Sequence, residues 1–151
     1  MPRDLVLYPD PLLLEKCEPV TEFDGELLKL ILEMVTVMER ENGVGLAASQ
    51  IGVLKQLFVY KGLGGEPKVA INPELLAHSY KTVAGTEGCL SIPDREFQVQ
   101  RPLSVQISAR GERGQELIIY GNGVRARVLM HELDHLSGTL LFDRGDEING
   151  S

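Results

Sequence analysis

The sequence has no tryptophan, only two cysteines and no excess of positive charge. Its 15 Lys and Arg against 22 Asp and Glu give a net charge of -7, which argues against a nucleic-acid-binding surface or a polybasic membrane anchor. Cys17 and Cys89 are too few and too far apart for the disulfide framework of a small secreted domain, so a reducing compartment is expected.

Long apolar runs are also missing. No stretch approaches the length of a membrane span, and the segment "MPRDLVLYPDP" has no apolar region typical of a signal peptide. We therefore expect no membrane association and a cytoplasmic location, in a bacterium or encoded by a phage. An organelle would fit if a transit peptide had been removed. With 151 residues, 43% of them hydrophobic, we expect a single globular domain spanning 1–151.

The secondary structure is expected to run helix, many strands, helix. Asp24 can cap a first helix whose apolar residues recur at helical spacing up to Met38, and Gly43 is expected to end it. Strand-like runs separated by turn signals follow at 56–60, 68–71, 80–86, 96–101, 103–109 and 116–121. A last helix is expected over 124–137, with Gly138 as its stop. This order predicts an α+β fold with antiparallel sheet.

The last predicted helix carries "HELDH" at 131–135. Positions i and i+4 share a helix face, so His131 and His135 can direct two imidazoles at one metal ion. Glu132 can then act as general base on a water that the metal activates. A chance pentad on an amphipathic helix is the alternative, but two of only three histidines are used here. His78 stands alone and is interpreted as a surface or strand-end residue.

A catalytic metal of this kind usually needs a third protein ligand. The position that metzincins fill with a third histidine is Leu141, and Asp143, Asp146 and Glu147 follow the helix stop too closely. Upstream, "GTEGCLSIP" offers Cys89, 42 positions before His131. A lone cysteine is more often a small buried hydrophobic residue, which is our interpretation of Cys17, but the missing ligand favours a metal role for Cys89.

A third segment, "GVGLAASQIG" at 43–52, is rich in small residues. A lone Gly-x-Gly is weak evidence for phosphate binding. Gln50 is a neutral donor that suits polarisation of a carbonyl, although an isolated glutamine is more often an ordinary loop residue.

Together the three segments resemble peptide deformylases. That family carries a glycine-rich segment ending in A-A-x-Q, then E-G-C-L-S, then H-E-x-x-H, and this chain has "GVGLAASQ", "EGCLS" and "HELDH" in the same order. The stretches "YPDPLL" and "INPEL" also look like the family, so the resemblance covers nearly the whole chain. It implies antiparallel sheets packed around a central C-terminal helix that carries the pentad, together with an N-terminal helix.

The resemblance implies a role for each matched position in the metal site. Cys89, His131 and His135 would bind the metal, and Glu132 would be the general base and acid. The side chain of Gln50 and the backbone N–H of Leu90 would hold the formyl oxygen as it becomes an oxyanion.

It also implies how the peptide binds. Val44, Gly45 and Gly88 would hydrogen-bond the peptide backbone as an added strand. The pocket for methionine would include Val128 and the stem of Arg127.

The cofactor implied is one divalent metal per chain, Fe²⁺ in the cell, with Zn²⁺, Ni²⁺ or Co²⁺ able to replace it. Zinc should bind a Cys/His/His site more tightly than ferrous iron, and a thiolate beside ferrous iron is exposed to oxidation. Purified protein could therefore carry a different metal. The partners implied are formylated nascent polypeptides, which could be met at the ribosome, and we expect a monomer with no direct nucleic-acid binding.

The sequence departs from the family pattern at three places. Ser49 stands where proline is common, and Met130 stands where glutamine is common, which could change the pocket or hydrogen bonds behind the ligands. The sequence also stops soon after "LFDRGDEING", without the C-terminal helix of many bacterial members, which weakens the case for ribosome docking by such a tail.

Three functions remain open at this point. The first is removal of the N-formyl group from formylmethionine, with release of formate. A generic metallopeptidase is the second, but proteases usually take a histidine or carboxylate where Cys89 is offered. The third is a non-catalytic metal-binding module, against which Glu132 argues. Asp134 points away from the metal face by helical spacing, and either pairs with Arg101 or is a solvated charge.

Overall fold

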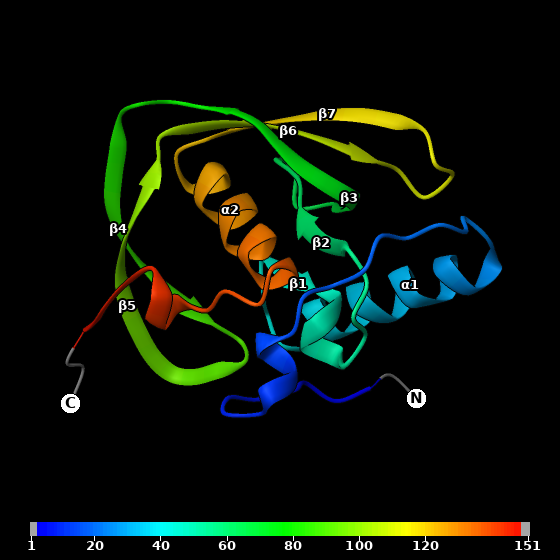
Figure 1. Cartoon of the computed structure of the whole chain (residues 1–151), viewed down its shortest axis with the longest axis horizontal. Helices are drawn as coiled ribbons and strands as arrows, with labels where there is room; N and C mark the ends of the chain where they lie inside the picture. Colours follow the sequence, from blue (N-terminus) through cyan, green and yellow to red (C-terminus); the bar gives the residue numbers. More distant parts are fainter. Residues whose placement is uncertain (1–2, 149–151) are drawn as a thin grey trace.

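The computed structural model describes residues 3–148 (Figure 1). Within these residues, two α-helices, three short 3-10 helices (η) and eight strands follow one another. The elements are η1 (Pro11–Leu14), α1 (Gly25–Arg40), β1 (Gly45–Ala47), η2 (Ala48–Ile51), β2 (Leu57–Lys61), β3 (Pro67–His78), β4 (Thr82–Cys89), β5 (Ile92–Pro102), β6 (Ser104–Arg110), β7 (Glu116–Asn122), α2 (Val124–Leu136), η3 (Leu141–Asp143) and β8 (Gly145–Ile148). The α+β fold with antiparallel sheets is confirmed.

The first helix begins as predicted and ends earlier. Asp24 accepts a hydrogen bond from the N–H of Leu27 at 3.0 Å and so caps α1. The helix stops at Arg40 rather than at Gly43. Asn42, with φ of 57°, takes the left-handed conformation after the last turn. The N–H of Gly43 instead returns to the carbonyl of Met38 at 2.8 Å, which satisfies a carbonyl left open by the last turn.

The second helix matches its prediction within one residue. Gly138, with φ of 75°, ends α2, and the N–H of Thr139 bonds the carbonyl of Asp134 at 3.0 Å. In Figure 1 this helix (orange) lies at the centre of the molecule, with β4 and β5 (green) to one side. Its apolar face packs on the larger sheet in a cluster of buried residues: Ala126, Leu129 and Leu136 from α2 with Phe58, Ala70, Ile107 and Ile119 from the strands.

Five strands form the larger sheet in the order β1-β2-β3-β6-β7, with antiparallel pairing at each junction. The sequence predicted four of them and no strand at β1, because Gly45, Leu46 and Ala47 are all buried and show no alternation. Helix α1 covers the face of this sheet opposite α2, where Met34 and Met38 pack with Leu46, Val59 and Ile71.

The smaller sheet has the order β4-β5-β8 and stands on the other side of α2 (Figure 1). Each junction is antiparallel, as hairpin spacing had predicted for β4 and β5. The strand β8 was missed, because "GDEI" has little strand propensity. It becomes a strand by pairing with residues 96–99 of β5, which lie far from it in the sequence. Within residues 3–148, the helices are too short or too polar to cross a membrane.

Candidate active site

Three potential metal ligands meet at the C-terminal half of α2. His131 and His135 lie one turn apart on that helix, and Cys89 is the last residue of β4. One ligand atom from each residue lies within 4.8 Å of the other two, and Cys89 Sγ is 3.4 Å from His135 Nε2. The structure therefore brings together, from segments 42 positions apart, the thiol and the two imidazoles that the sequence offered.

The donor set suits a divalent transition metal. One thiol and two imidazoles are ligands that zinc and ferrous iron accept, and a catalytic site leaves a position for water or substrate. Burial and the charge of His131 lower the pKa of His135 to about 3, so this imidazole is neutral at pH 7 and has a lone pair to donate. The Nδ1 atom of His135 has no protein partner among residues 3–148.

Glu87 fixes the ring of the other imidazole. Its Oε1 lies 3.1 Å from His131 Nδ1. Burial raises the pKa of Glu87, but hydrogen bonds from Arg101 and His131 hold it at about 2, so its carboxylate is charged and can only accept. One ring proton is therefore on Nδ1, and loss of the other proton, from Nε2, would let Nε2 of His131 bind a cation.

A buried ion network continues behind Glu87. Arg101, 3% exposed, donates from Nε and Nη2 to both oxygens of Glu87, each at 2.9 Å, and from Nη1 to Asp134 at 2.7 Å. The pairing of Asp134 with Arg101 was one of two interpretations from the sequence, and it is confirmed. Arg144 adds two hydrogen bonds to Asp134, at 3.1 and 3.0 Å, and so ties the segment after η3 to the back of α2.

The carboxylate of Glu132 lies beside the three ligands and is only 4% exposed. Its Oε1 has no hydrogen-bond partner among the described residues. Burial raises its pKa to about 7, against the opposing charges of His131 and Arg101. A Cβ atom at Gly45 would lie 2.6 Å from its Oε2, so the absence of a side chain at that position gives the carboxylate its space.

Gln50, 1% exposed, points its amide group at the thiol from η2. Its Nε2 lies 3.7 Å from Cys89 Sγ and donates to Ser91 Oγ at 3.1 Å, while its Oε1 accepts from the N–H of Ala47 at 3.0 Å. The bond to Ala47 orients the amide so that its NH₂ faces the site. Leu90 and Ser91 form the two-residue turn between β4 and β5, which places Leu90 directly after the thiol.

Cys89, His131, Glu132 and Gln50 line a cleft of about 740 Å³. Each of the four residues predicted to bind substrate lines it, together with the predicted oxyanion donors: Val44, Gly45, Gly88, Val128, Gln50 and Leu90. The cleft runs between the edge of β4 and the segment that precedes β1, so two backbone edges face each other across it. An extended peptide could pair with such edges.

Other residues singled out in the sequence lie elsewhere. Met130 packs against the core cluster around α2 and does not line the cleft, and Ser49 is fully buried beside Cys17. Burial raises the pKa of the Cys17 thiol to about 11, and a hydrogen bond with Ser49 lowers it by less than burial raises it. A structural role for Cys17 is in keeping with this shift.

His78 is exposed on β3. Arg127 lines the cleft but its guanidinium bonds Glu87 and the carbonyls of Val83 and Val99.

Sequence reasoning assigned no role to Glu87 or Ser91. Both are buried polar residues within four positions of Cys89, and Glu87 contacts His131 while Ser91 contacts Gln50. Their position beside Cys89 could have identified them, because polar residues that flank a metal ligand often orient the ligands, and carboxylates such as Glu87 commonly do so.

A family model described as polypeptide deformylase matches residues 2–150 of the sequence. The chain belongs to this family. Peptide deformylase 1 of Clostridium acetobutylicum is 44% identical over 149 residues, which are 99% of this chain and 98% of the relative. A chloroplastic peptide deformylase 1B of Solanum lycopersicum is 39% identical over 95% of this chain and 53% of its own length.

Solved structures with a similar fold are also peptide deformylases. The peptide deformylase of Thermotoga maritima superposes with a TM-score of 0.93 at 36% identity, covering 97% of this chain and 99% of that one. A peptide deformylase of Legionella pneumophila gives a TM-score of 0.91 at 37% identity, over 95% and 86% of the two chains. Peptide deformylases are metal-dependent hydrolases that remove the N-formyl group from nascent polypeptides, and this chain is such an enzyme.

Proposed function

We propose that the chain deformylates nascent polypeptides with Glu132 as general base at a metal held by Cys89, His131 and His135. The observation that supports this is the convergence of three ligand atoms within 4.8 Å of one another beside a buried carboxylate. One oxygen of that carboxylate has no hydrogen-bond partner within residues 3–148. When bound there, a divalent cation supplies Lewis-acid chemistry, which makes a water more acidic and draws electrons from a carbonyl oxygen.

Glu132 moves the proton in this reaction. Its Oε1 is free to accept a proton from the attacking water, and a pKa near neutrality lets it release that proton again. The water oxygen bonds the formyl carbon, the bond from that carbon to the methionine nitrogen breaks, and the nitrogen receives the proton from Glu132. The products are formic acid and a free amine, and the acid then passes its proton to the amine and leaves as formate, so atoms and charge balance.

Gln50 and Leu90 hold the formyl oxygen as negative charge develops on it. The Nε2 atom of Gln50 faces Cys89, and Leu90 follows Cys89 in the turn, so a side-chain N–H and a backbone N–H are available close to the thiol. Donors fixed before the reaction stabilise an oxyanion more than flexible ones do. Hydrogen bonds to Ala47 and Ser91 hold the Gln50 amide in place.

The peptide binds as a strand across the cleft. Gly88 at the edge of β4, and Val44 and Gly45 opposite, present backbone groups to it. Val128, one turn before the ligand pair on α2, contributes an apolar wall for the methionine side chain.

Ferrous iron is the metal we propose for the cell, with zinc, nickel or cobalt able to replace it. We further propose that the enzyme works as a monomer, in bacterial cytoplasm or an organelle, on chains that emerge from the ribosome. Bacterial and chloroplastic relatives support these locations.

Formate release from formyl-Met-Ala-Ser under anaerobic conditions, with ferrous iron supplied, tests the proposal. We expect formate from this peptide and no cleavage of unformylated Met-Ala-Ser. Cleavage of peptide bonds without formate would contradict deformylation. The Glu132→Ala variant should keep its metal and lose turnover by about 100-fold to 10,000-fold, and survival of activity would refute the role of Glu132 as base.

A further inference from the structure

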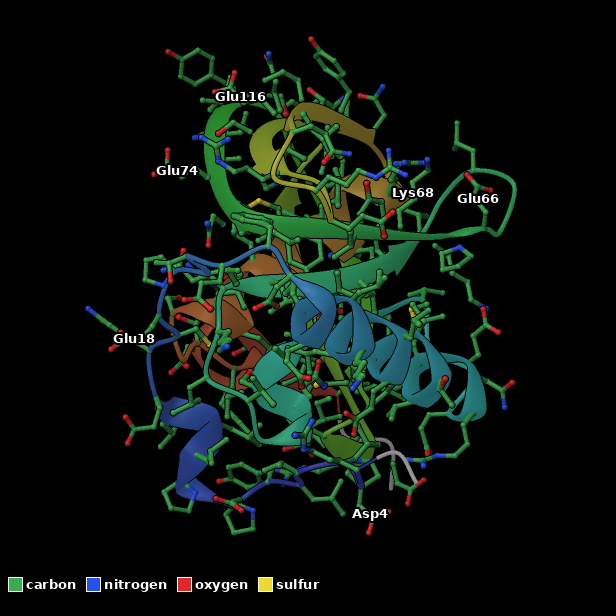
Figure 2. The ribbon with its side chains drawn as sticks, turned by 90° about the vertical axis from the view of Figure 1, so that its right-hand side faces the viewer. Asp4, Glu18, Glu66, Lys68, Glu74 and Glu116 are labelled. Atoms are coloured by element: carbon green, nitrogen blue, oxygen red, sulfur yellow. The ribbon has the colours of Figure 1, made fainter. Side chains whose placement is uncertain are left out.

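A second hollow, of about 650 Å³, lies apart from the catalytic cleft, and no described residue lines both. One wall is β7 and the other is the hairpin of β2 and β3, while Arg125 reaches the hollow from the first turn of α2. In Figure 2 the hairpin projects to the right, with Glu66 near its outer end and Lys68 closer to the body of the molecule. We call this hollow the β7 slot.

The strand β7 turns an unpaired edge toward the slot. The four consecutive residues Leu117–Tyr120 all line it. Because side chains alternate between the two faces of a strand, a hollow that touches all four lies beside the strand rather than over one face. Among the described strands β7 pairs only with β6, so its other edge is the one that borders the slot.

Pairing with β6 decides which backbone groups face the slot. The N–H of Gly111 donates to the carbonyl of Gln115 at 2.9 Å across the turn between β6 and β7. In an antiparallel pair, the residues that exchange hydrogen bonds with the partner strand recur at every second position. Counted from Gln115, the odd-numbered residues of β7 bond β6, and the N–H and C=O groups of Ile118 and Tyr120 point outward.

This outward edge is apolar and lacks the usual protection of an edge strand. Ile118 is 48% exposed and Tyr120 is 66% exposed. The strand contains neither lysine nor proline, two residues that commonly keep edge strands from pairing with other chains. Leu63, on the opposite wall, is also exposed. A free edge of this kind can take up an extended peptide as a further strand.

Arg125 supplies a charge for such a peptide to match. Its Nε is buried without a hydrogen-bond partner among residues 3–148, and the guanidinium forms no ion pair with a carboxylate of that range. Glu66, on the hairpin, pairs instead with Lys68 at 3.8 Å. The guanidinium carbon of Arg125 lies 5.7 Å from the centre of the Tyr60 ring, which helps to hold it in place. A buried N–H without a partner is costly, so the slot favours a ligand that brings an acceptor.

Tyr60 adds a hydroxyl to the same end of the slot. Burial raises the pKa of Tyr60 by more than the charge and a hydrogen bond of Arg125 lower it, so the hydroxyl is protonated at pH 7. Glu112 is the acid that lines the slot, and it is exposed on the turn between β6 and β7 without an ion pair to Arg125. The cation and the phenol together suit a carboxylate.

We propose that the β7 slot binds an extended peptide segment that adds to the edge of β7 and places a carboxylate on Arg125. Ile118 and Tyr120 offer two N–H and two C=O groups to the peptide backbone, and their exposed side chains contact its apolar residues. The carboxylate belongs to an Asp or Glu side chain or to the C-terminus of the segment. This binding is separate from the removal of the formyl group.

Three acetylated hexapeptides test the proposal. They share Thr-Val-Thr-Val-Thr and end in glutamate amide, glutamine amide or valine with a free carboxylate. Each is titrated into zinc-loaded, ¹⁵N-labelled enzyme, and the dissociation constant is taken from the amide chemical shifts. We expect a peptide with a carboxylate to bind about 10-fold more tightly than the glutamine peptide, with the largest shifts at Ile118 and Tyr120. The two acidic peptides distinguish a side chain from a C-terminus as the source.

Variants assign the binding to the slot. Arg125→Met should bring the ratio of glutamate to glutamine peptide to unity, whereas Arg113→Met, at an exposed cation outside the slot, should preserve it. Tyr120→Pro removes an outward N–H without touching the bonds to β6, so it should weaken every peptide. Tyr120→Val keeps that N–H and should still bind. Ratios are taken within each variant, so a loss of folded protein cancels.

Four outcomes would overturn the proposal. These are no binding of either acidic peptide at millimolar concentration, equal binding of all three peptides, shifts confined to the catalytic cleft, and a ratio that Arg125→Met leaves intact. A dimer in sedimentation equilibrium that Tyr120→Pro dissociates would also overturn it, because the added strand would then be a second copy of this chain.

Formate release tests the catalytic site separately. Arg125→Met should release formate from formyl-Met-Ala-Ser at the wild-type rate, and a loss in this variant alone would contradict the separation of the two sites. No formate from either protein would refute deformylation, while the peptide titrations would still decide the β7 slot.

Discussion

His131 Nδ1 donates a hydrogen bond to Glu87 Oε1 at 3.1 Å. This contact joins the metal-binding helix to β4, the strand that also ends in Cys89. It sets which nitrogen of His131 is free to bind a metal, and Arg101 in turn fixes Glu87 with two hydrogen bonds of 2.9 Å. The site is therefore held by the sheet as much as by the helix.

Glu87→Gln should weaken metal binding by about 10-fold to 100-fold, because a neutral amide orients and polarises the His131 ring less than a carboxylate does. The rate at which a chelator removes the metal measures this directly. Glu33→Gln removes an acid that pairs with Arg3 on the surface of α1, and it should leave the release rate unchanged. Unchanged release from Glu87→Gln would show that Glu87 does not support His131.

Arg101→Met should lower the free energy of unfolding by about 3–5 kcal/mol, because it leaves Glu87 and Asp134 as buried charges with fewer partners. Urea denaturation followed by circular dichroism gives the value. Arg95→Met removes an exposed pair with Glu147 and should have a much smaller effect, since water screens that pair. Similar losses of unfolding free energy in both variants would show that burial does not increase the contribution of the Arg101 ion pairs to stability.

Gly45→Ala should lower kcat by about 100-fold while metal content stays the same. The new Cβ would lie 2.6 Å from Glu132 Oε2 and 2.9 Å from its Cγ, so the carboxylate must move. Gly25→Ala is a suitable control, because nothing lies within 4 Å of a Cβ at that position. Metal analysis and formate release on the same preparations separate loss of the base from loss of the metal, and wild-type kcat in Gly45→Ala would contradict the crowding argument.

The Cys17 thiol should resist alkylation in the folded protein. Burial raises its pKa from 9.0 to about 11, so the reactive thiolate is scarce at pH 8. Because the folded state holds this proton more tightly, its contribution to stability is complete below pH 9 and is lost as the pH rises toward 11. Iodoacetamide followed by peptide mapping should label Cys17 only after denaturation, and rapid labelling at pH 8 without denaturant would contradict the shift.

The two helices and most of the strands were predictable from the sequence, because local patterns encode them. Asp24 caps α1 through a bond three residues on, and Gly138 ends α2 through its positive φ. By contrast, β1 and β8 were missed, since Gly45–Ala47 and Gly145–Ile148 become strands only through pairing with β2 and β5. Their own residues carry no strand periodicity.

By itself the sequence determined that His131, Glu132 and His135 share one end of a helix, because helical spacing fixes which residues neighbour one another. The missing third ligand made Cys89 a candidate and the donor chemistry of an amide did so for Gln50, and family resemblance gave each of them a definite role. The tertiary structure alone decided that Glu87 faces His131 and that Arg101 joins Glu87 to Asp134. These relationships depend on strand register and on packing between segments tens of residues apart, which no local pattern of residues specifies.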